Sequence, residues 1–369
     1  MFRPDVIAAY TARVAVTAIG LTMRLLPRRN KVTLLSRQSN TPSLDYRMLH
    51  DAIRSEAPDV EVVVIARMVP PGLIGKVGYA LHLVREIYHA ETSRVLVIDG
   101  YSIVASVLPH SPGLSVVQTW HALGALKKFG LSVLGRPGGR DPKLAAAMRM
   151  HAGYDLIVAS AERCRAPFAD AFGTSIDRVV VAPLPRVDRL TDPSERTLAR
   201  DRFLQLYPQL AGKPIAVYAP TFRTDGEASD PVALTGAFAD IGYALVTKLH
   251  PLVPVPTDPR LITAPHMSTQ DMLLVADVFI TDYSSTLFEA AVAGVPCYLL
   301  AEDLTRFHDD RDFYLSYPDD LGIPLAHSVE ELIRLMAAPG SPMLAPGFVD
   351  VDESGGATTR LAQLVLSLR

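Results

Sequence analysis

The chain has 369 residues, 49% of them hydrophobic, and a formal net charge of -3 at pH 7. That length allows two domains of ordinary size, each with a buried core. The charge excludes the strongly basic surface by which proteins bind nucleic acids non-specifically. The two cysteines, Cys164 and Cys297, belong to no CxxC pair or other metal-ligand spacing. We therefore expect a reduced protein with no disulfide framework, no zinc site and no nucleic-acid partner.

An apolar stretch, VIAAYTARVAVTAIGLTMRLL, fills residues 6–26 and is followed by the basic sequence PRRNK. Arg13 interrupts the continuous apolar core that a secretory signal needs. A helix spanning the membrane would place Arg13 and Arg24 in or near hydrocarbon, where a charged side chain is costly. A helix lying in the membrane interface fits these arginines better. A helix packed on the protein's own core is the alternative.

A helical wheel of residues 1–30 separates a polar from an apolar side. The polar side carries Arg13, Arg24, Tyr10, Thr17 and Gly20, and the apolar side carries Ile7, Val14, Ala18, Leu25 and Leu26. We predict that the apolar side lies on a membrane surface and that Arg28, Arg29 and Lys31 meet anionic headgroups. An exposed apolar stripe would serve a homo-oligomer equally well, so the sequence leaves that partner open.

From residue 31 onward, short β-branched runs alternate with segments of helical length, a pattern typical of parallel, doubly wound sheets. The predicted strands are 31–36, 60–66, 94–99, 114–120, 155–160 and 178–183 in a first series, then 214–220, 243–250, 277–282 and 295–300 in a second. The predicted helices are 43–55, 73–90, 162–172, 194–207, 269–276, 284–294 and 356–369. The proline-rich and charged segment 183–195 separates the two series and is the expected hinge.

These elements predict an α/β protein with two Rossmann-like domains that face a cleft. We expect a membrane-surface helix at 1–30, a first domain at 31–190, a second at 191–350 and a C-terminal helix at 351–369. In doubly wound sheets, ligands bind at the carboxyl ends of the strands. The sequence places its unusual polar residues at those ends.

The stretch VFITDYSSTLFEAAVAGVPCY begins with a buried strand that turns into a helix at two serines. Ser284 and Ser285 could cap that helix, or the helix end could cradle a phosphate with its unpaired N–H groups. Glu289, one turn later, could accept hydrogen bonds from ribose hydroxyls, or it could simply be solvated. The motif by itself leaves both interpretations open.

The segment TWHALGALKKFG at 119–130 follows another predicted strand. His121 is placed as a general base, because the pKa of histidine lies near neutral pH. Lys127 and Lys128 follow within two turns and could neutralise a phosphate. A loop histidine beside two solvent-exposed lysines is the simpler alternative.

Three further clusters stand at strand ends or at the hinge. His250 and Lys248 in KLHP could stabilise a charged leaving group, although a core histidine is the commoner case. Arg223 in YAPTFRTD could bind a phosphate with two parallel hydrogen bonds. Arg186 and Asp188 in PLPRVD could contact the ligand or form a hinge salt bridge. The clusters together predict a nucleotide-diphosphate site whose chemistry depends on positioning and positive charge, without a metal.

The ordered motifs W-H-A-x-G-A-x-K-K-F-G, P-x-P-R-x-D, Y-A-P-T-F-R, K-x-H-P, I-T-D-Y-S-S and R-D-F-Y cover roughly residues 90–335. This set resembles the CDP-glycerol glycerophosphotransferase family, the teichoic acid primases and polymerases of bacterial cell walls. The resemblance implies a GT-B-like fold with an acceptor-binding N-terminal domain and a nucleotide-binding C-terminal domain. It also implies an enzyme at the cytoplasmic face of the cell membrane, bound peripherally.

The implied reaction transfers a polyol phosphate, first of all glycerol phosphate, from a CDP-alcohol to a hydroxyl of a lipid-linked glycan. CDP-glycerol or CDP-ribitol is the donor substrate, CMP is released, and no cofactor is implied. By the same resemblance His121 matches the catalytic base, and His250 matches a second catalytic histidine near the donor diphosphate. The implied donor contacts are Arg223, Lys248, Asp282, Ser284, Ser285 and Glu289, and the implied acceptor or phosphate contacts are Lys127, Lys128, Arg186 and Asp188.

The chain departs from the family at two places. It has WHALG at 120–124 where many members have WHGTP, and PLPRVD at 183–188 where many have GYPRND. These changes leave the acceptor and the number of units added open. Because the length accommodates two catalytic domains and little more, we expect addition of one or a few units. The alternatives are a GT-B glycosyltransferase or epimerase that uses a UDP-sugar, and a non-catalytic membrane-bound scaffold.

Overall fold

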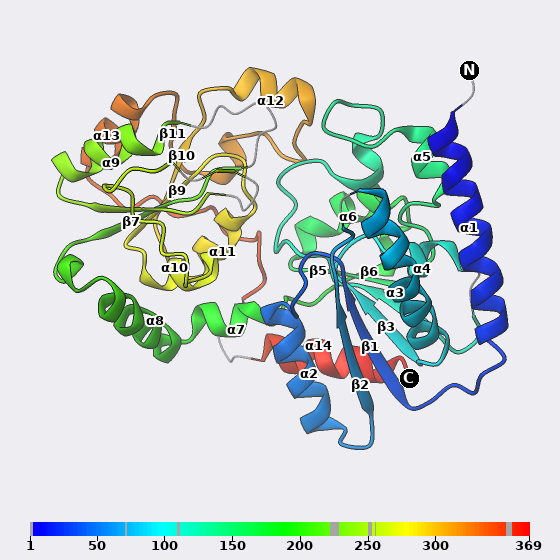
Figure 1. The fold of residues 1–369 in the computed structure, drawn as a ribbon. Helices are drawn as coiled ribbons and strands as arrows, with labels where there is room; N and C mark the ends of the chain where they lie inside the picture. Colours follow the sequence, from blue (N-terminus) through cyan, green and yellow to red (C-terminus); the bar gives the residue numbers. More distant parts are fainter. Residues whose placement is uncertain are drawn as a thin grey trace. The chain divides into compact units, whose positions relative to one another are not determined.

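The computed structural model describes residues 3–70, 72–108, 111–221, 229–249, 253–254, 256–351 and 356–369, and only the backbone of Leu73, Ile74, Lys76 and Val77. The chain forms two compact units. The first unit comprises Met1–Ala122, Lys128–Arg186 and Asp350–Arg369, and the second comprises Leu123–Lys127 and Val187–Val349. Each unit contains one parallel sheet (Figure 1). The predicted α/β class with two sheets is therefore confirmed.

The first unit has a six-stranded sheet in the order β2-β1-β3-β4-β5-β6. Its strands are β1 Lys31–Ser36, β2 Glu61–Ala66, β3 Val95–Ile98, β4 Ser115–Gln118, β5 Leu156–Ala159 and β6 Val179–Val181, and its helices are α1 Pro4–Met23, α2 Leu44–Glu56, α3 Leu73–Glu91, α4 Ile103–Val107, α5 Pro142–Ala147, α6 Arg165–Phe172 and α14 Ala357–Ser367. The central strands β1 and β3 are buried along their whole length. Strand β3 is a continuous apolar run because helices cover both faces of such a sheet, whereas β1 also buries Lys31, Thr33 and Ser36.

Helices α2 and α14 cover the same face of this sheet. Their buried side chains, including Tyr46, Ile53, Leu361 and Val365, form one core with strand residues such as Val97. Each large apolar side chain buried there contributes about 1.5–3 kcal/mol to the free energy of folding. The C-terminal helix therefore belongs to the core of the first unit, although it follows the second unit in sequence.

The second unit has a five-stranded sheet in the order β11-β10-β9-β7-β8. Its strands are β7 Ile215–Tyr218, β8 Ala244–Thr247, β9 Val278–Thr281, β10 Cys297–Leu300 and β11 Leu325–Ala326. The helices from the hinge onward are α7 Arg186–Thr191, α8 Pro193–Leu206, α9 Pro231–Asp240, α10 Thr269–Val275, α11 Thr286–Val292, α12 Leu304–Asp310 and α13 Val329–Ala337. The ten predicted strands all occur, whereas the two-residue strand β11 is too short for a periodic signal.

Helix α1 is packed through a narrow seam and exposes most of its apolar side. Ala9, Val16 and Gly20 are buried, and a Cβ on Gly20 would lie 2.2 Å from a methyl group of Leu108. The five residues predicted for the apolar side, Ile7, Val14, Ala18, Leu25 and Leu26, are all exposed. By length and composition alone this helix could also cross a membrane. Tyr10, assigned by the wheel to the opposite side, is 49% exposed.

Two of the three basic residues expected at a membrane surface point into the protein. Lys31 is fully buried, because it begins the central strand β1, and its ammonium group donates to the Thr92 hydroxyl. The Arg28 guanidinium donates to Ser111 and to the carbonyl oxygen of Pro112. The prediction that Arg28 and Lys31 meet headgroups is therefore wrong, and Arg29 alone keeps a largely exposed side chain.

Candidate active site

His121 stands three residues beyond the end of β4, on a sharp turn. Trp120 takes a left-handed backbone conformation with φ 56°, which is strained for a bulky residue. The side chain of Gln118 holds the turn, because its Oε1 accepts a 2.9 Å hydrogen bond from the Trp120 N–H. The Nε2 group of the same side chain donates to the carbonyl oxygen of Gly100. The turn presents His121 as an exposed side chain at the carboxyl edge of the sheet.

The imidazole of His121 has a defined orientation. Its Nδ1 lies 3.0 Å from the backbone carbonyl oxygen of Asp99, which directly follows β3, and 3.3 Å from the side-chain amide of Gln38. A carbonyl oxygen can only accept, so we assign the proton to Nδ1. In that tautomer Nε2 carries the lone pair and can take a proton from a substrate. Sequence reasoning missed both partners, although Asp99 is the last residue of the strand predicted at 94–99 and Gln38 follows the strand predicted at 31–36.

An aromatic cluster in the first unit supports the turn. The Trp120 ring is stacked on Phe129 at 4.7 Å and meets Phe172 edge-on at 5.5 Å. His151 lies in the same cluster, and burial lowers its pKa to about 4, so its ring is neutral near pH 7. These packed rings keep His121 in one place despite its exposure.

Burial also raises the pKa of the Asp99 carboxyl group, beside the His121 turn, to about 6.

The segment after His121 leaves the first unit for five residues. Leu123–Lys127 belongs to the second unit, where the Leu126 carbonyl accepts a hydrogen bond from Tyr314 N–H. A Cβ on Gly124 would lie 2.5 Å from the buried ring of Phe288 on α11, so no larger residue fits there without a shift. The chain therefore links the turn that carries His121 directly to a helix of the second unit.

The two lysines of this segment belong to different units. The ammonium of Lys127 lies 5.9 Å from the centre of the Phe307 ring, within cation–π range. Lys128 is half-buried and belongs to the first unit. The predicted contact of both lysines with phosphate stays a prediction.

Asp282 organises the loops at the carboxyl edge of the second sheet. Its carboxylate is 1% exposed, and Oδ1 accepts hydrogen bonds from Thr221 N–H at 2.8 Å and Tyr283 N–H at 2.6 Å. Its own carbonyl accepts from the Tyr317 hydroxyl. A buried carboxylate that already accepts from two backbone N–H groups holds the loops after β7 and β9 together. Asp282 therefore has a structural role at this edge of the sheet, and its predicted contact with the donor stays a prediction.

Ser284 and Ser285 are half-exposed at the start of α11. The Ser284 hydroxyl accepts a hydrogen bond from Thr286 N–H and donates one to the Thr286 hydroxyl. Ser285 is the N-cap residue, and its side chain forms no capping bond with the helix. Capping therefore accounts for Ser284 only. The first three N–H groups of α11 already have acceptors, because Thr286 N–H donates to the Ser284 hydroxyl, and Leu287 N–H and Phe288 N–H donate to the carbonyl oxygens of Ser284 and Ser285.

Glu289 and Lys248 have partners within the second unit. Glu289 is 5% exposed, and its Oε2 accepts from the side-chain amide of Gln270 at 3.2 Å. The ammonium of Lys248 donates to the carbonyl oxygens of Thr263, Ala264 and Met267 at 2.8–3.1 Å. Because an ammonium has three N–H groups, Lys248 holds this loop with all of them. Lys248 therefore has a structural role, and the donor contact expected of it stays a prediction.

Arg186 is also a structural residue. It is 8% exposed, and its Nε donates to the Asp45 carboxylate at 2.9 Å while its backbone N–H donates to the same group at 2.8 Å. The pair joins the start of α7 to the start of α2. The hinge salt bridge expected as the alternative for Arg186 takes the form of an ion pair with Asp45, and its predicted ligand contact stays untested. Asp188 is half-exposed on α7, and its predicted contact stays untested.

Two of the predicted site residues, Arg223 and His250, lie outside the described residues. Among the described residues no group of three His, Cys, Asp or Glu side chains is arranged to hold a metal ion. The first unit carries the oriented His121, and the second unit carries the start of α11 with Glu289.

Comparisons with known proteins identify the class. The family described as CDP-glycerol:poly(glycerophosphate) glycerophosphotransferase matches residues 18–341. The chain is 31% identical over 331 residues to the teichoic acid ribitol-phosphate primase of Bacillus spizizenii, covering 86% of this chain and 85% of the relative. It is 26% identical to the teichoic acid glycerol-phosphate primase of Bacillus subtilis, covering 80% and 75%. The chain therefore belongs to this family of transferases, as the motifs indicated.

Solved structures show the fold. The wall teichoic acid polymerase TagF superposes with a TM-score of 0.73 at 17% sequence identity, over 100% of this chain and 98% of the other. The UDP-GlcNAc 2-epimerase of Methanocaldococcus jannaschii superposes with a TM-score of 0.60 at 12% identity, over 91% and 99%. Both likenesses concern the fold, and the predicted GT-B-like class is confirmed.

Proposed function

We propose that this protein transfers a polyol phosphate from a CDP-alcohol to a hydroxyl of a lipid-linked glycan, with release of CMP, in the synthesis of teichoic acid or a related cell-surface polymer. The observation that carries the proposal is the orientation of His121. Its Nδ1 is held by the Asp99 carbonyl, so Nε2 can accept a proton. The family supports the substrate class, and the orientation of the ring supports the assignment of His121 as the base.

The proposed step balances without an oxidant or a cofactor. Nε2 of His121 takes the proton of the acceptor hydroxyl, and the oxygen attacks the phosphorus that carries the polyol. The bond from that phosphorus to the oxygen shared with CMP breaks, and CMP leaves with the negative charge. We assign stabilisation of this charge to Arg223 and His250, as the motifs imply. Ser284 and Ser285, at the start of α11, would contact the donor diphosphate through their hydroxyl groups, and Glu289 would bind the ribose.

We expect the Ser284→Ala/Ser285→Ala variant to raise the KM for the CDP-alcohol about ten- to a hundredfold, because two hydroxyl contacts with a charged group are lost. The matched control is Ser328→Ala, which removes a serine cap at the start of α13 in the same unit. Calorimetric titration with the CDP-alcohol measures the effect. Equal donor affinity in the double variant and the control would show that the two serines do not contribute to donor binding.

The polyol is decided by assay, since the relatives named above are divided between ribitol phosphate and glycerol phosphate. The purified protein is incubated with CDP-glycerol, CDP-ribitol or a UDP-sugar, with and without a lipid-linked disaccharide, and nucleotide release is measured. Acceptor-dependent CMP from one CDP-alcohol, undiminished by EDTA, is the expected result. Release of UDP without CMP would replace the proposal by the UDP-sugar alternative.

We further propose that the exposed side of α1 places the enzyme on the membrane surface, where a lipid-linked acceptor is found. Val14 and Leu25 are 67% and 86% exposed. The Val14→Glu/Leu25→Glu variant should lower binding to anionic lipid vesicles about a hundredfold, because two apolar side chains no longer enter the interface. Leu198→Glu is the control, since Leu198 is 62% exposed on α8. Unchanged co-sedimentation of the double variant would refute the assignment.

A further inference from the structure

Two arginines that no predicted motif contains stand side by side at the carboxyl edge of the first sheet. Arg37 follows β1 and Arg67 follows β2, and the residues before them, Ser36 and Ala66, are paired in register. Both guanidinium groups approach the ring of Tyr79 on α3, at 5.7 Å and 5.9 Å from its centre. Two positive charges are thus gathered around one aromatic side chain.

The arginines form no close ion pair in the part of the chain that the structure describes, and the buried Nε of Arg37 has no hydrogen-bond acceptor there. The nearby acid, Glu86, is 1% exposed and accepts from the Tyr79 hydroxyl at 2.7 Å. Burial raises the pKa of Glu86, and the charges of both arginines oppose that rise. Arg37 also hydrogen-bonds to the Tyr79 side chain, which leaves Arg67 as the exposed cation of the two. Two neighbouring guanidinium groups, one half-buried and one exposed, can together bind a phosphate.

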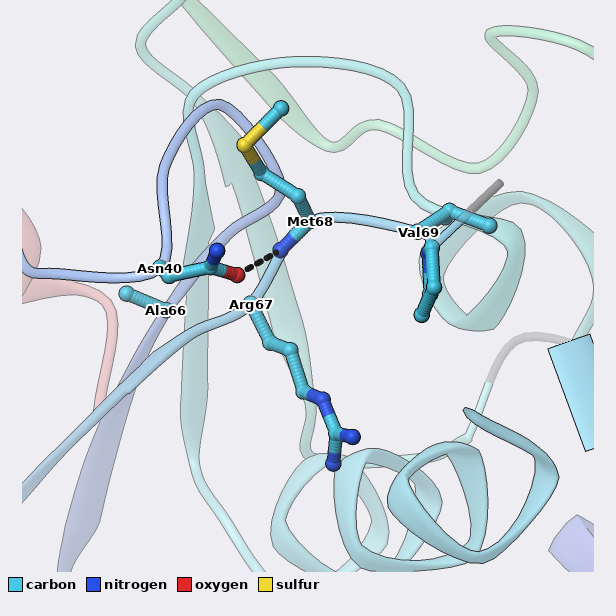
Figure 2. A pocket seen from close by; sticks show the side chains of 6 residues that line it. Asn40, Ala66, Arg67, Met68 and Val69 are labelled. Carbon is cyan, nitrogen blue, oxygen red and sulfur yellow. Dashed lines mark hydrogen bonds between the residues drawn. The ribbon is translucent and has the colours of Figure 1, made fainter. Parts of the chain in front are cut away.

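A hollow of about 570 Å³ lies beside Arg67. Its lining is Asn40 and residues 66–70, and the Asn40 side chain fixes the wall by accepting from Met68 N–H at 3.0 Å. Figure 2 shows this bond and the Arg67 side chain reaching away from it toward a neighbouring helix. Met68 and Val69 are 47% and 37% exposed. The site therefore offers positive charge next to exposed apolar side chains.

This cluster lies on the same edge as the proposed base. The strand order β2-β1-β3-β4 puts Arg67, Arg37, Asp99 and His121 in a row at successive strand ends. Neighbouring strands are about 4.8 Å apart, so the row spans roughly 10–15 Å. Gln38, next to Arg37, also contacts the ring of His121. One extended ligand could therefore reach both the arginines and His121 within the first unit.

We propose that Arg37 and Arg67 bind the phosphate that joins the acceptor glycan to its lipid, and that the hydrocarbon chain leaves over Met68 and Val69. This inference rests on the proposed function and names the end of the acceptor that the first unit recognises. The glycan would then extend along the strand ends and bring its hydroxyl to His121.

The first experiment is a calorimetric titration with farnesyl diphosphate, inorganic pyrophosphate and farnesol. The wild-type protein should bind farnesyl diphosphate at least tenfold more tightly than pyrophosphate, and farnesol not measurably. Arg37→Gln/Arg67→Gln should weaken farnesyl diphosphate binding about a hundredfold, roughly tenfold for each charged hydrogen-bonding group. Met68→Ser/Val69→Ser should remove the advantage over pyrophosphate. Isotherms that are the same for the wild type and the arginine variant would overturn the proposal.

Two controls make the result specific. Arg54→Gln removes an exposed arginine of α2 that belongs to neither site, and it should bind all three probes as the wild type does. Arg67→Gln alone changes an exposed side chain, so it tests the site even if the double variant is unstable. Vesicles of phosphatidylglycerol should bind the arginine variant and the wild type equally. If the arginine variant lost vesicle binding but bound farnesyl diphosphate normally, the arginines would be assigned to membrane headgroups and the proposal would be refuted.

Transfer assays separate this inference from the reaction itself. With a working donor, the arginine variant should raise the acceptor KM about a hundredfold and leave the donor KM unchanged. Arginine-dependent binding of farnesyl diphosphate without CMP release from any CDP-alcohol would support the anion site and refute the reaction. CMP release with an unchanged acceptor KM in the variant would support the reaction and refute the site.

Discussion

Replacing His121 by alanine is expected to lower the kcat of polyol-phosphate transfer about 10²- to 10⁴-fold, the range that a general base contributes, without changing donor affinity. The proposed mechanism assigns His121 to the proton of the acceptor hydroxyl and assigns donor binding to other residues, so its removal should leave donor binding unchanged. The measurement is CMP release under saturating donor and acceptor, together with calorimetric titration of the CDP-alcohol.

The controls for this prediction follow from the contacts of the ring. Gln38→Ala removes only the longer contact with Nδ1, at 3.3 Å, and keeps the backbone carbonyl of Asp99 at 3.0 Å. We expect it to cost less than tenfold in kcat. Turnover of His121→Ala within a few-fold of wild type would show that another group takes the proton. A large, equal loss in both variants would mean that the loop, and not the base, had been damaged.

Asp282→Ala is expected to destabilise the second unit by about 2–6 kcal/mol, because two buried backbone N–H groups lose their acceptor. The affected groups are those of Thr221 and Tyr283, which begin the loops after β7 and β9. Donor affinity should fall at least tenfold as a consequence, since Ser284 follows directly in the chain. Thermal unfolding and donor titration measure the two effects.

Asp282→Asn tests the mechanism of that loss. The amide keeps one oxygen in the place of Oδ1, so we expect it to retain most of the stability that alanine removes. If Asp282→Ala instead has normal stability but no longer binds the donor, Asp282 contacts the donor directly. That outcome would restore the role implied by the family motifs and contradict the structural role argued from its two N–H partners.

The strand-end rule found some of the candidate site and missed the rest for a physical reason. His121, Ser284 and Ser285 attract notice because their chemistry is unusual where a strand ends. Arg37 and Arg67 also follow strands, but an isolated arginine after a strand has no distinguishing pattern. Only the register of β1 with β2, and the ring of Tyr79 on α3, makes them a pair.

The internal partners of buried polar residues were not predicted, for the same reason. Arg186 pairs with Asp45 across 141 residues of sequence, and Asp282 receives Thr221 N–H across 61. Each was expected to contact a ligand, since a polar residue beside a phosphate motif is easily taken as part of it. The groups that hydrogen-bond to a buried charge can come from distant segments of the chain. The local sequence does not show which segments the fold brings together.

The sequence by itself determined the ten longer strands, the separation into two parallel sheets, the exposed apolar side of α1 and the position of His121 after a strand. Each depends on periodicity within a few residues, which physical chemistry converts directly into local structure. Tertiary structure alone decided that α14 completes the first core, that Leu123–Lys127 belongs to the second unit and that Lys31 is buried. These depend on contacts between distant segments, whose free energy is settled only when the whole chain is packed.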